Sequence, residues 1–304
     1  MKYKKLSFFA ILCLSFTALA LLLTSCNSFS ETEYAIVEEG LIFDIYTYDK
    51  YENSTVRITG IDGMPKHLII PEKINGMTVV EIADGAFADN DILLYLELPK
   101  GSIKLGKEFC SGSLALTGIN LSGSVSVIPE NAFEGCLNLA RIDGTEGITS
   151  IESQAFAGCS ALPSLAIPET LTFIGDEAFR GCTALSSIRI PSSVTFIGES
   201  AFWGCDGLAA AEMLCSAEIP EFCFLGCTSL TSVKIGNNVT AINNEAFRNC
   251  RALYSVEIGK NCKTIGDYAF HACDQLTEIV FADKANVSIN EGNEALSGQN
   301  KEAE

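Results

Sequence analysis

The stretch that decides the fold runs from Ile174 to Pro191 and reads Ile-Gly-Asp-Glu-Ala-Phe-Arg-Gly-Cys-Thr-Ala-Leu-Ser-Ser-Ile-Arg-Ile-Pro. Its apolar positions change spacing midway. In the second half, Ile188 and Ile190 alternate with the charged Arg189, which is typical of a half-buried strand. In the first half, the spacing of the apolar residues predicts a turn or a short helical segment. One such unit cannot enclose a core alone, so it must stack on copies of itself.

Copies of this unit recur along the chain at a nearly fixed interval. Seven cysteines each follow a phenylalanine by three residues: Cys136, Cys159, Cys182, Cys205, Cys227, Cys250 and Cys273. The interval is 23 residues, with a single step of 22 between Cys205 and Cys227. Self-similarity at such a period indicates a repeat architecture. We therefore predict a repeat solenoid with short parallel strands on one face and turns or short helical segments on the other.

Two recurring residue types, glycine in the turns and proline at the strand ends, support this interpretation. A glycine precedes the cysteine in most units, which favours a tight turn with positive φ, and Asn249 replaces it in one unit. Asparagine tolerates the left-handed region better than most residues do. Proline follows the strand at Pro99, Pro168 and Pro191, where its missing N–H predicts the end of strand pairing.

The shared pattern IGxxAFxGCxxLxxIxIP resembles the BspA-like leucine-rich-repeat family of bacterial surface proteins over about residues 68 to 282. The resemblance implies a leucine-rich-repeat solenoid that acts by binding. We expect about nine 23-residue repeats in residues 82–282, preceded by a β-rich N-terminal cap in residues 34–81 that shields the first repeat. Residues 283–304 are rich in polar side chains and predict a C-terminal partial cap and tail.

The first 26 residues have the features of an export signal. Lys2, Lys4 and Lys5 precede an apolar run from Leu6 to Leu23, which ends in Leu-Thr-Ser-Cys at Cys26. That tetrapeptide resembles a bacterial lipobox, which implies that Cys26 is the first mature residue and carries lipid. Residues 27–33 then form a tether. The prediction is an exported, membrane-anchored lipoprotein at the cell surface; the alternative is an N-terminal membrane-spanning anchor, because the run has about the minimum length for one.

The periodic cysteines invite a disulfide or a zinc interpretation, and both fit poorly. Neighbouring parallel strands lie about 4.8 Å apart, whereas Cβ atoms in a disulfide are about 3.5 to 4.5 Å apart. Zinc needs four ligands that converge on one point, and a column presents a line. We predict buried, reduced thiols that act as small apolar side chains.

Charge and motif content narrow the possible functions. The formal net charge is −18 and becomes −21 when the three lysines of the signal are removed, which disfavours nucleic acid as a partner. The chain contains only two histidines, His67 and His271, which we expect to face solvent, and it has no nucleophile elbow, HExxH, P-loop or GxGxxG motif. We predict no catalytic residues, no metal and no cofactor.

The outward positions of the predicted strands form the candidate binding surface. Two columns of side chains lie on this face, and a third column on the neighbouring ridge contains Trp203 after Arg180. An exposed tryptophan beside arginine has the composition of an interaction hot spot. The favoured interpretation is structural: Trp203 covers the ridge and Arg180 stacks on it. The candidate residues are Tyr95, Glu97, Asn120, Arg141, Asp143, Arg189, Glu212, Lys234, Glu257 and Trp203.

These observations predict a lipid-anchored protein that binds an unidentified protein or glycan ligand, with adhesion as its role. The alternative is a structural, envelope-organising protein without a host ligand. The sequence does not identify the ligand.

Overall fold

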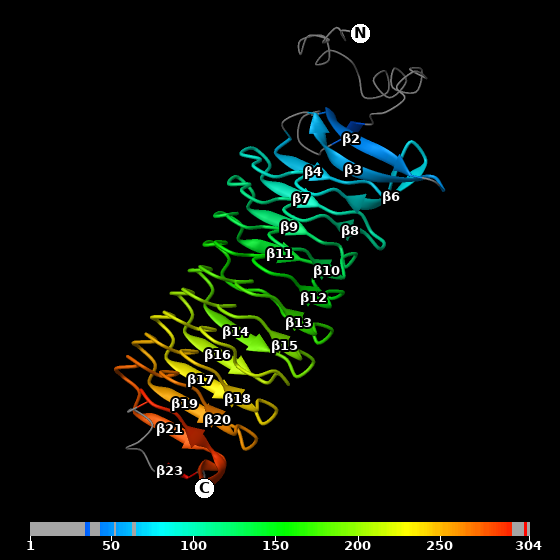
Figure 1. The fold of residues 1–304 in the computed structure, drawn as a ribbon. Coiled ribbons are helices and arrows are strands. Elements are labelled where there is room, and N and C mark those ends of the chain that lie inside the picture. Colours follow the sequence, from blue (N-terminus) through cyan, green and yellow to red (C-terminus); the bar gives the residue numbers. More distant parts are fainter. Residues whose placement is uncertain (1–33, 37–42, 52, 63–64, 294–300, 303–304) are drawn as a thin grey trace.

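The computed structural model describes residues 34–36, 43–51, 53–62, 65–293 and 301–302. The chain winds into an elongated stack of coils, with the cap strands β1 (Tyr34–Ile36), β2 (Phe43–Tyr51) and β3 (Thr55–Asp62) at one end and β21 (Glu278–Phe281) at the other (Figure 1). Parallel strands form two columns that run along the stack. The predicted repeat solenoid is confirmed.

The longer strands form the face predicted from the Leu-x-x-Ile-x-Ile pattern. They pair in parallel and in register, so that each residue lies beside its counterpart one coil away. The first group is β4 (His67–Ile69), β7 (Tyr95–Glu97), β9 (Gly118–Asn120) and β11 (Arg141–Asp143). The second is β14 (Ser187–Ile190), β16 (Ala210–Met213), β17 (Ser232–Ile235), β19 (Ser255–Ile258), β21 (Glu278–Phe281) and β23 (Lys301–Glu302).

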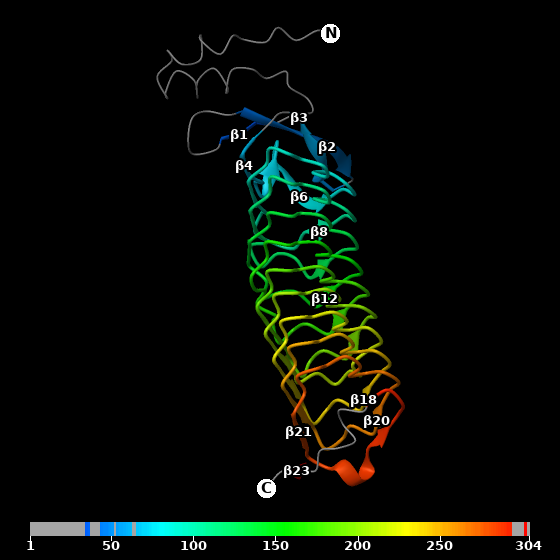
Figure 2. The same ribbon diagram turned by 90° about the vertical axis from the view of Figure 1, so that its left-hand side faces the viewer.

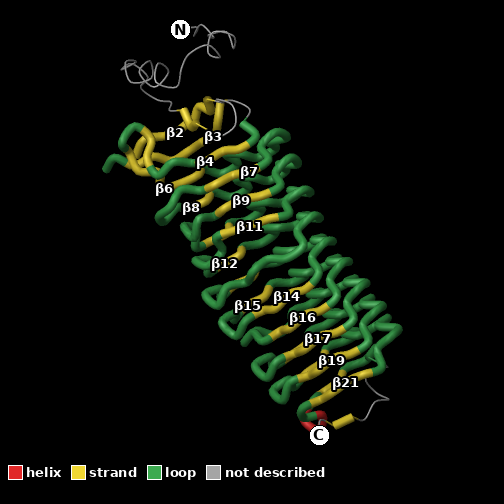
Figure 3. The backbone as a smooth tube through the Cα atoms, turned by 180° about the vertical axis from the view of Figure 1, so that it is seen from behind, coloured by secondary structure: helices red, strands yellow, loops and turns green. Residues whose placement is uncertain are grey.

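A second column of two-residue parallel strands was not predicted. Each of these strands consists of an isoleucine and the residue that precedes it, and all but the last lead into a phenylalanine turn. Only a turn or helical segment was expected there, and Figure 3 shows these strands beside the longer ones. Its members are β10 (Val127–Ile128), β12 (Ser150–Ile151), β13 (Phe173–Ile174) and β15 (Phe196–Ile197), then β18 (Ala241–Ile242), β20 (Thr264–Ile265) and β22 (Ser288–Ile289). The remainder of each coil is turns. The helix in the described residues is the single 3-10 turn η1 (Lys284–Asn286).

Three prolines explain where these sheets break. In the short-strand sheet, the N–H after each strand donates to the isoleucine carbonyl of the previous coil, as Gly198 does to Ile174 at 2.8 Å. Pro129 and Pro220 occupy that position and have no N–H. The sheet stops before β10 and after β15. Pro163 likewise stands where Ala140 and Ser186 donate in neighbouring coils, and the long-strand sheet is interrupted between β11 and β14.

The single 22-residue step lies in one loop. Met213 pairs with Ile190, 23 residues earlier, and with Ile235, 22 residues later, whereas Ile219 bridges Ile242 at the full interval. The missing residue is therefore in residues 214–218. Because both flanking strands keep their register, the core of this coil is preserved.

Apolar columns fill the space between the two sheets. The phenylalanines of successive coils are fully buried and stacked, with ring centroids 5.1 to 5.3 Å apart from Phe133 to Phe270. Where Cys110 takes the phenylalanine position, Phe109 turns its ring edge to Phe133 at 5.0 Å. The predicted positive φ at the glycine column is confirmed, at 71° for Gly181 and 63° for Asn249.

The N-terminal end carries a mostly antiparallel sheet that continues into the stack, as the side view in Figure 2 shows. Its strands are β1 (Tyr34–Ile36), β2 (Phe43–Tyr51), β3 (Thr55–Asp62), β5 (Lys73–Ile74), β6 (Met77–Ile82) and β8 (Lys104–Leu105). The repeat sheets begin inside the segment assigned to the cap, because β4 pairs with β7 and β6 pairs with β8. At the other end β22 extends the short-strand sheet beyond residue 282.

Candidate functional site

The strand face, meaning the outward side of β4, β7, β9, β11, β14, β16, β17, β19 and β21, presents two rows of side chains. The pairing places nearly all the predicted surface residues in these rows. Glu97, Asn120 and Asp143 are in register in one row, which continues after the break as Arg189, Glu212, Lys234 and Glu257. Tyr95 and Arg141 belong to the other. The break at Pro163 separates an N-terminal from a central part of the face.

In the N-terminal part, an aromatic side chain lies over a glycine. A Cβ built on Gly118 would be 3.1 Å from Cδ2 of Tyr95, so a side chain at this position would crowd the ring. His67 meets Tyr95 edge-on at 6.4 Å. Burial, together with the nearby Glu97 and Asp143 carboxylates, raises the pKa of Tyr95. Beside this pair, Arg141 Nε contacts Asp143 Oδ2 at 2.6 Å.

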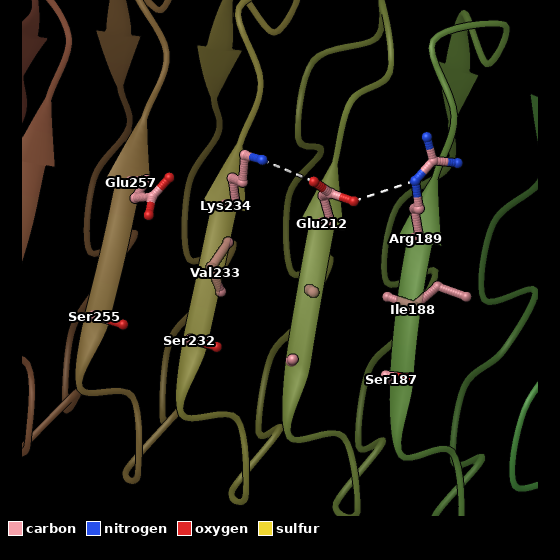
Figure 4. A pocket seen from close by; sticks show the side chains of 11 residues that line it. Ser187, Ile188, Arg189, Glu212, Ser232, Val233, Lys234, Ser255 and Glu257 are labelled. Atoms are coloured by element: carbon pink, nitrogen blue, oxygen red, sulfur yellow. Dashed lines mark hydrogen bonds and ion pairs between the residues drawn. The ribbon is translucent and has the colours of Figure 1, made fainter.

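In the central part, four charged side chains alternate in sign across four neighbouring strands. Glu212 accepts hydrogen bonds at 2.9 Å from Lys234 Nζ and is 3.2 Å from Arg189 Nε (Figure 4). The Lys234 hydrogen bond, followed by the charges of Lys234 and Arg189, lowers the pKa of Glu212. Arg189 also contacts Glu169 at 3.1 Å. These arginine and lysine side chains are therefore already neutralised within the chain.

Beside the charged row lies a row of small residues, which forms the floor of a shallow, open depression of about 390 Å³. Figure 4 shows the serine side chains of this row pointing to the same side as the charges. The floor consists of Ser187, Ala210, Ser232 and Ser255. A depression this open suits contact with another surface better than enclosure of a small molecule.

Trp203 lies on the ridge rather than on the strand face. It is 38% exposed, and the guanidinium of Arg180 lies 4.7 Å from its ring centroid. Arg180 also contacts Glu177 at 3.0 Å. The stacking arrangement considered from the sequence is thus present, and it covers one face of the ring. Trp203 is not brought together with the charged row.

The structure adds exposed aromatic residues that the sequence analysis did not single out. Phe173 and Phe196 point outward from the short-strand sheet and stack with centroids 4.8 Å apart, and Phe196 is 47% exposed. Tyr254 is 48% exposed at the start of β19, and its hydroxyl donates to Glu278 at 2.9 Å. Phe173 and Phe196 each directly precede the isoleucine of a short strand. Recognising those segments as strands would have predicted that both phenylalanines point outward on the same face.

The cysteines offer no reactive site. All eleven in the described residues are free and buried, which confirms the prediction made for the seven periodic cysteines. Burial raises the pKa of Cys136, Cys205 and Cys273 to about 12, so the thiolate needed for reaction is scarce.

The described residues also contain no assembled group of side chains for acid–base catalysis or metal binding. His67 and His271 are exposed in the first and last parts of the repeat stack, too far apart to act together. Within the described ranges, no cluster of three His, Cys, Asp or Glu side chains could hold a metal ion.

The predicted export signal, Cys26 and the tether lie outside the described residues. None of the helical structure in the described part of the chain has the length and apolar character needed to cross a bilayer.

Comparison with solved structures finds leucine-rich repeat proteins and a vaccine antigen, all at low identity. The leucine-rich repeat protein of T. pallidum is 24% identical, with 76% of this chain and 87% of that one covered and a TM-score of 0.45. A leucine-rich repeat protein from Eubacterium ventriosum is 18% identical, with 88% and 95% covered and a TM-score of 0.47. The pneumococcal vaccine antigen PcpA is 16% identical, with 88% of this chain and 95% of that one covered and a TM-score of 0.40. No curated protein matches.

Comparison with protein families gives a match over most of the chain. The BspA type leucine-rich repeat region matches in six copies, over residues 80–209 and 215–296. These ranges contain the phenylalanine turns and most strands of the two parallel columns; β4, β16 and β23 lie outside them. The chain belongs to the BspA-type leucine-rich repeat family.

Proposed function

We propose that this protein is an exported, lipid-anchored interaction protein whose strand face binds a protein ligand, with adhesion as its role. One observation carries the proposal: the outward side chains of the strand face differ from coil to coil, while the core columns beneath them are nearly constant. Tyr95, Gly118 and Arg141 succeed one another outside, above Leu96, Ile119 and Ile142 inside. Variation limited to one face is expected where a particular surface is recognised.

A protein ligand fits the shape of this face better than a small molecule does. The face is open, mixed in polarity and extends over many coils, which matches the composition and extent of protein interfaces. The N-terminal part also combines Tyr95, Arg141 and His67, and tyrosine and arginine are enriched among residues that dominate binding energy. Catalysis is not part of the proposal, because no acid, base or nucleophile pair is assembled on this face.

The binding test is capture of host-matrix and envelope proteins from a defined panel by the full-length chain. We expect saturable capture of a protein that Tyr95→Ala with Arg141→Ala weakens at least tenfold, while Lys263→Ala, at an exposed position next to the short strand β20, leaves capture unchanged. Equal capture by all three proteins would contradict the assignment to the strand face. Binding to a glycan array without protein capture would replace the protein ligand by a glycan, and no capture at all would favour the envelope-organising role.

The lipid anchor is tested separately. Cys26→Ala should abolish incorporation of labelled fatty acid and leave uncut precursor, because the proposed lipid is attached to that sulfur. Label that persists in this variant would contradict the lipoprotein assignment.

A further inference from the structure

The four charges at the centre of the strand face have an order that is complementary to itself when reversed. Arg189, Glu212, Lys234 and Glu257 read plus, minus, plus, minus along β14, β16, β17 and β19, and Figure 4 shows all four side chains projecting from the same side. Read from the other end the order is minus, plus, minus, plus. In a chain with a formal charge of −18, this row is locally neutral.

We propose that this part of the strand face is a contact between two copies of the chain. The copies would be related by a two-fold axis that lies in the plane between the two faces, above the gap between β16 and β17, and runs parallel to the strands. Rotation about this axis turns one face onto the other and reverses the order of the coils. Each row then meets its own copy, as an isologous interface requires. The proposal deepens the proposed function, because it names one partner of the same strand face.

Every charge in the row acquires an opposite charge across such an interface. Arg189 meets Glu257 of the second copy, and Glu212 meets Lys234 of the second copy; the other two contacts follow by symmetry. One coil after Glu257 the row continues at Val280. One coil before Arg189 the 23-residue spacing places Ala166, at a position that forms no strand, where the long-strand sheet is interrupted between β11 and β14. The axis would bring these two apolar side chains together. The alternation thus continues into a matched apolar contact at both ends.

The row of small residues makes the approach possible. Ser187, Ala210, Ser232 and Ser255 lie beside the charges and define the depression, so no bulky side chain on this row holds the faces apart. Under the same axis Ala210 meets Ser232 of the second copy, and Ser187 meets Ser255. The side chains of Arg189 and Lys234, each 55% exposed, would then be the first to touch.

The size of the face predicts a weak contact. Six coils at about 4.8 Å and four-residue strands at about 3.3 Å per residue give a face of roughly 30 by 13 Å. This footprint of about 400 Å² per chain is half of the approximately 800 Å² per partner in a standard stable interface. We expect a reversible dimer that weakens with salt, because exposed charges are screened. The strands β4 to β11 stay uncovered for another ligand.

The test is a charge-exchange experiment on the full-length chain, purified in detergent, without ligand. Lys234→Glu places like charges opposite each other in a homodimer, and so does Glu212→Lys. We expect each variant alone to self-associate at least tenfold more weakly than the wild type in sedimentation velocity. Mixed one to one, they restore opposite charges at both contacts and should form a heterodimer in native mass spectrometry. Lys263→Glu makes the same charge change away from the face and should dimerise like the wild type.

Three results would overturn the proposal: a wild-type chain that stays monomeric at the highest soluble concentration, variants that self-associate as the wild type does, or no preference for the mixed pair. Unchanged far-ultraviolet circular dichroism shows that each variant is folded, and Arg189→Gln with Glu257→Gln offers a second pair if either is not. Since no ligand is present, a negative ligand capture leaves this measurement unaffected.

Discussion

The thiol of Cys182 donates a hydrogen bond to the backbone carbonyl oxygen of Phe156, 26 residues earlier in the chain, with 3.2 Å between sulfur and oxygen. The same contact recurs from Cys136 to Cys273, at 3.0 to 3.2 Å. In the coil where serine replaces the cysteine, Ser113 Oγ donates to the Phe87 carbonyl at 2.7 Å. The periodic cysteine is therefore a buried donor that links one coil to the previous one, as well as a small apolar side chain.

Cys182→Ser should accordingly destabilise the protein less than Cys182→Ala. The hydroxyl can make the contact that Ser113 makes, whereas alanine removes a donor to a buried carbonyl, at a cost of about 1 to 3 kcal/mol. Urea unfolding midpoints of the two variants check this. Equal midpoints would show that the thiol contributes only volume.

Stability should fall steeply above pH 9. Burial raises the pKa of the core thiols above the ordinary value of 9.0, to about 12 for Cys136, Cys205 and Cys273. Between these values the unfolded chain loses protons that the folded chain keeps, so the free energy of unfolding decreases by up to about 1.4 kcal/mol per pH unit for each thiol.

Denaturant titrations between pH 8 and 11 measure that slope, and Cys205→Ala should reduce it by one proton. A slope that this substitution leaves unchanged would mean that Cys205 ionises alike in both states. The wild type and the Cys205→Ala variant share every other cysteine. The difference between their slopes therefore reports on Cys205 without chemical blocking of the other thiols.

Phe179→Ala should reduce the free energy of unfolding by about 3 to 5 kcal/mol, the usual cost of truncating a buried aromatic side chain. Phe179 is fully buried between Phe156 and Phe202, with centroids 5.3 and 5.2 Å away. Phe196→Ala is the matched control, because Phe196 stacks similarly on Phe173 but is 47% exposed. Similar losses for both variants would contradict a core role specific to the phenylalanine column.

The repeat length, the core columns and the long strands could be predicted from the sequence because each is a periodic property of side chains. The alternation of Ile188, Arg189 and Ile190 specifies which side of a strand faces the core, and the 23-residue interval specifies what lies beside it. The pairing of Tyr95 with Gly118 and of Arg189 with Glu212 was predictable for the same reason.

Features that depend on backbone hydrogen bonds between coils could not be predicted in this way. The short strands contain two residues each, too few to show alternation. The functions of Pro129, Pro163 and Pro220 emerge only when the donor column that each occupies is known. Charge contacts such as Lys234 with Glu212 require the register. They mean that charge reversal of Arg189 and Lys234 would disrupt a row of ion pairs rather than change two free side chains.

The last coil is closed by one asparagine that the composition of the tail did not single out. Asn293 is 4% exposed; its Oδ1 accepts the Phe270 N–H at 2.9 Å, and its Nδ2 donates to the Gly266 carbonyl at 2.8 Å. In earlier coils the phenylalanine N–H donates to a backbone carbonyl of the next coil, as Phe247 does to Ala269. The Asn293 side chain thus takes the place of a further repeat.

Asn293→Ala should therefore leave buried groups of the last coil without partners and cost about 1 to 3 kcal/mol. The loss should be local, because each coil contacts only its neighbours. Hydrogen exchange measures it: amides of residues 264–281 should exchange faster, while those of residues 118–143 keep wild-type rates. Asn286→Ala is the control, since Asn286 is exposed and its side-chain amide donates to Asp283 within its own turn. Faster exchange along the whole stack would show instead that the repeats unfold as one unit and that Asn293 is not a terminal cap.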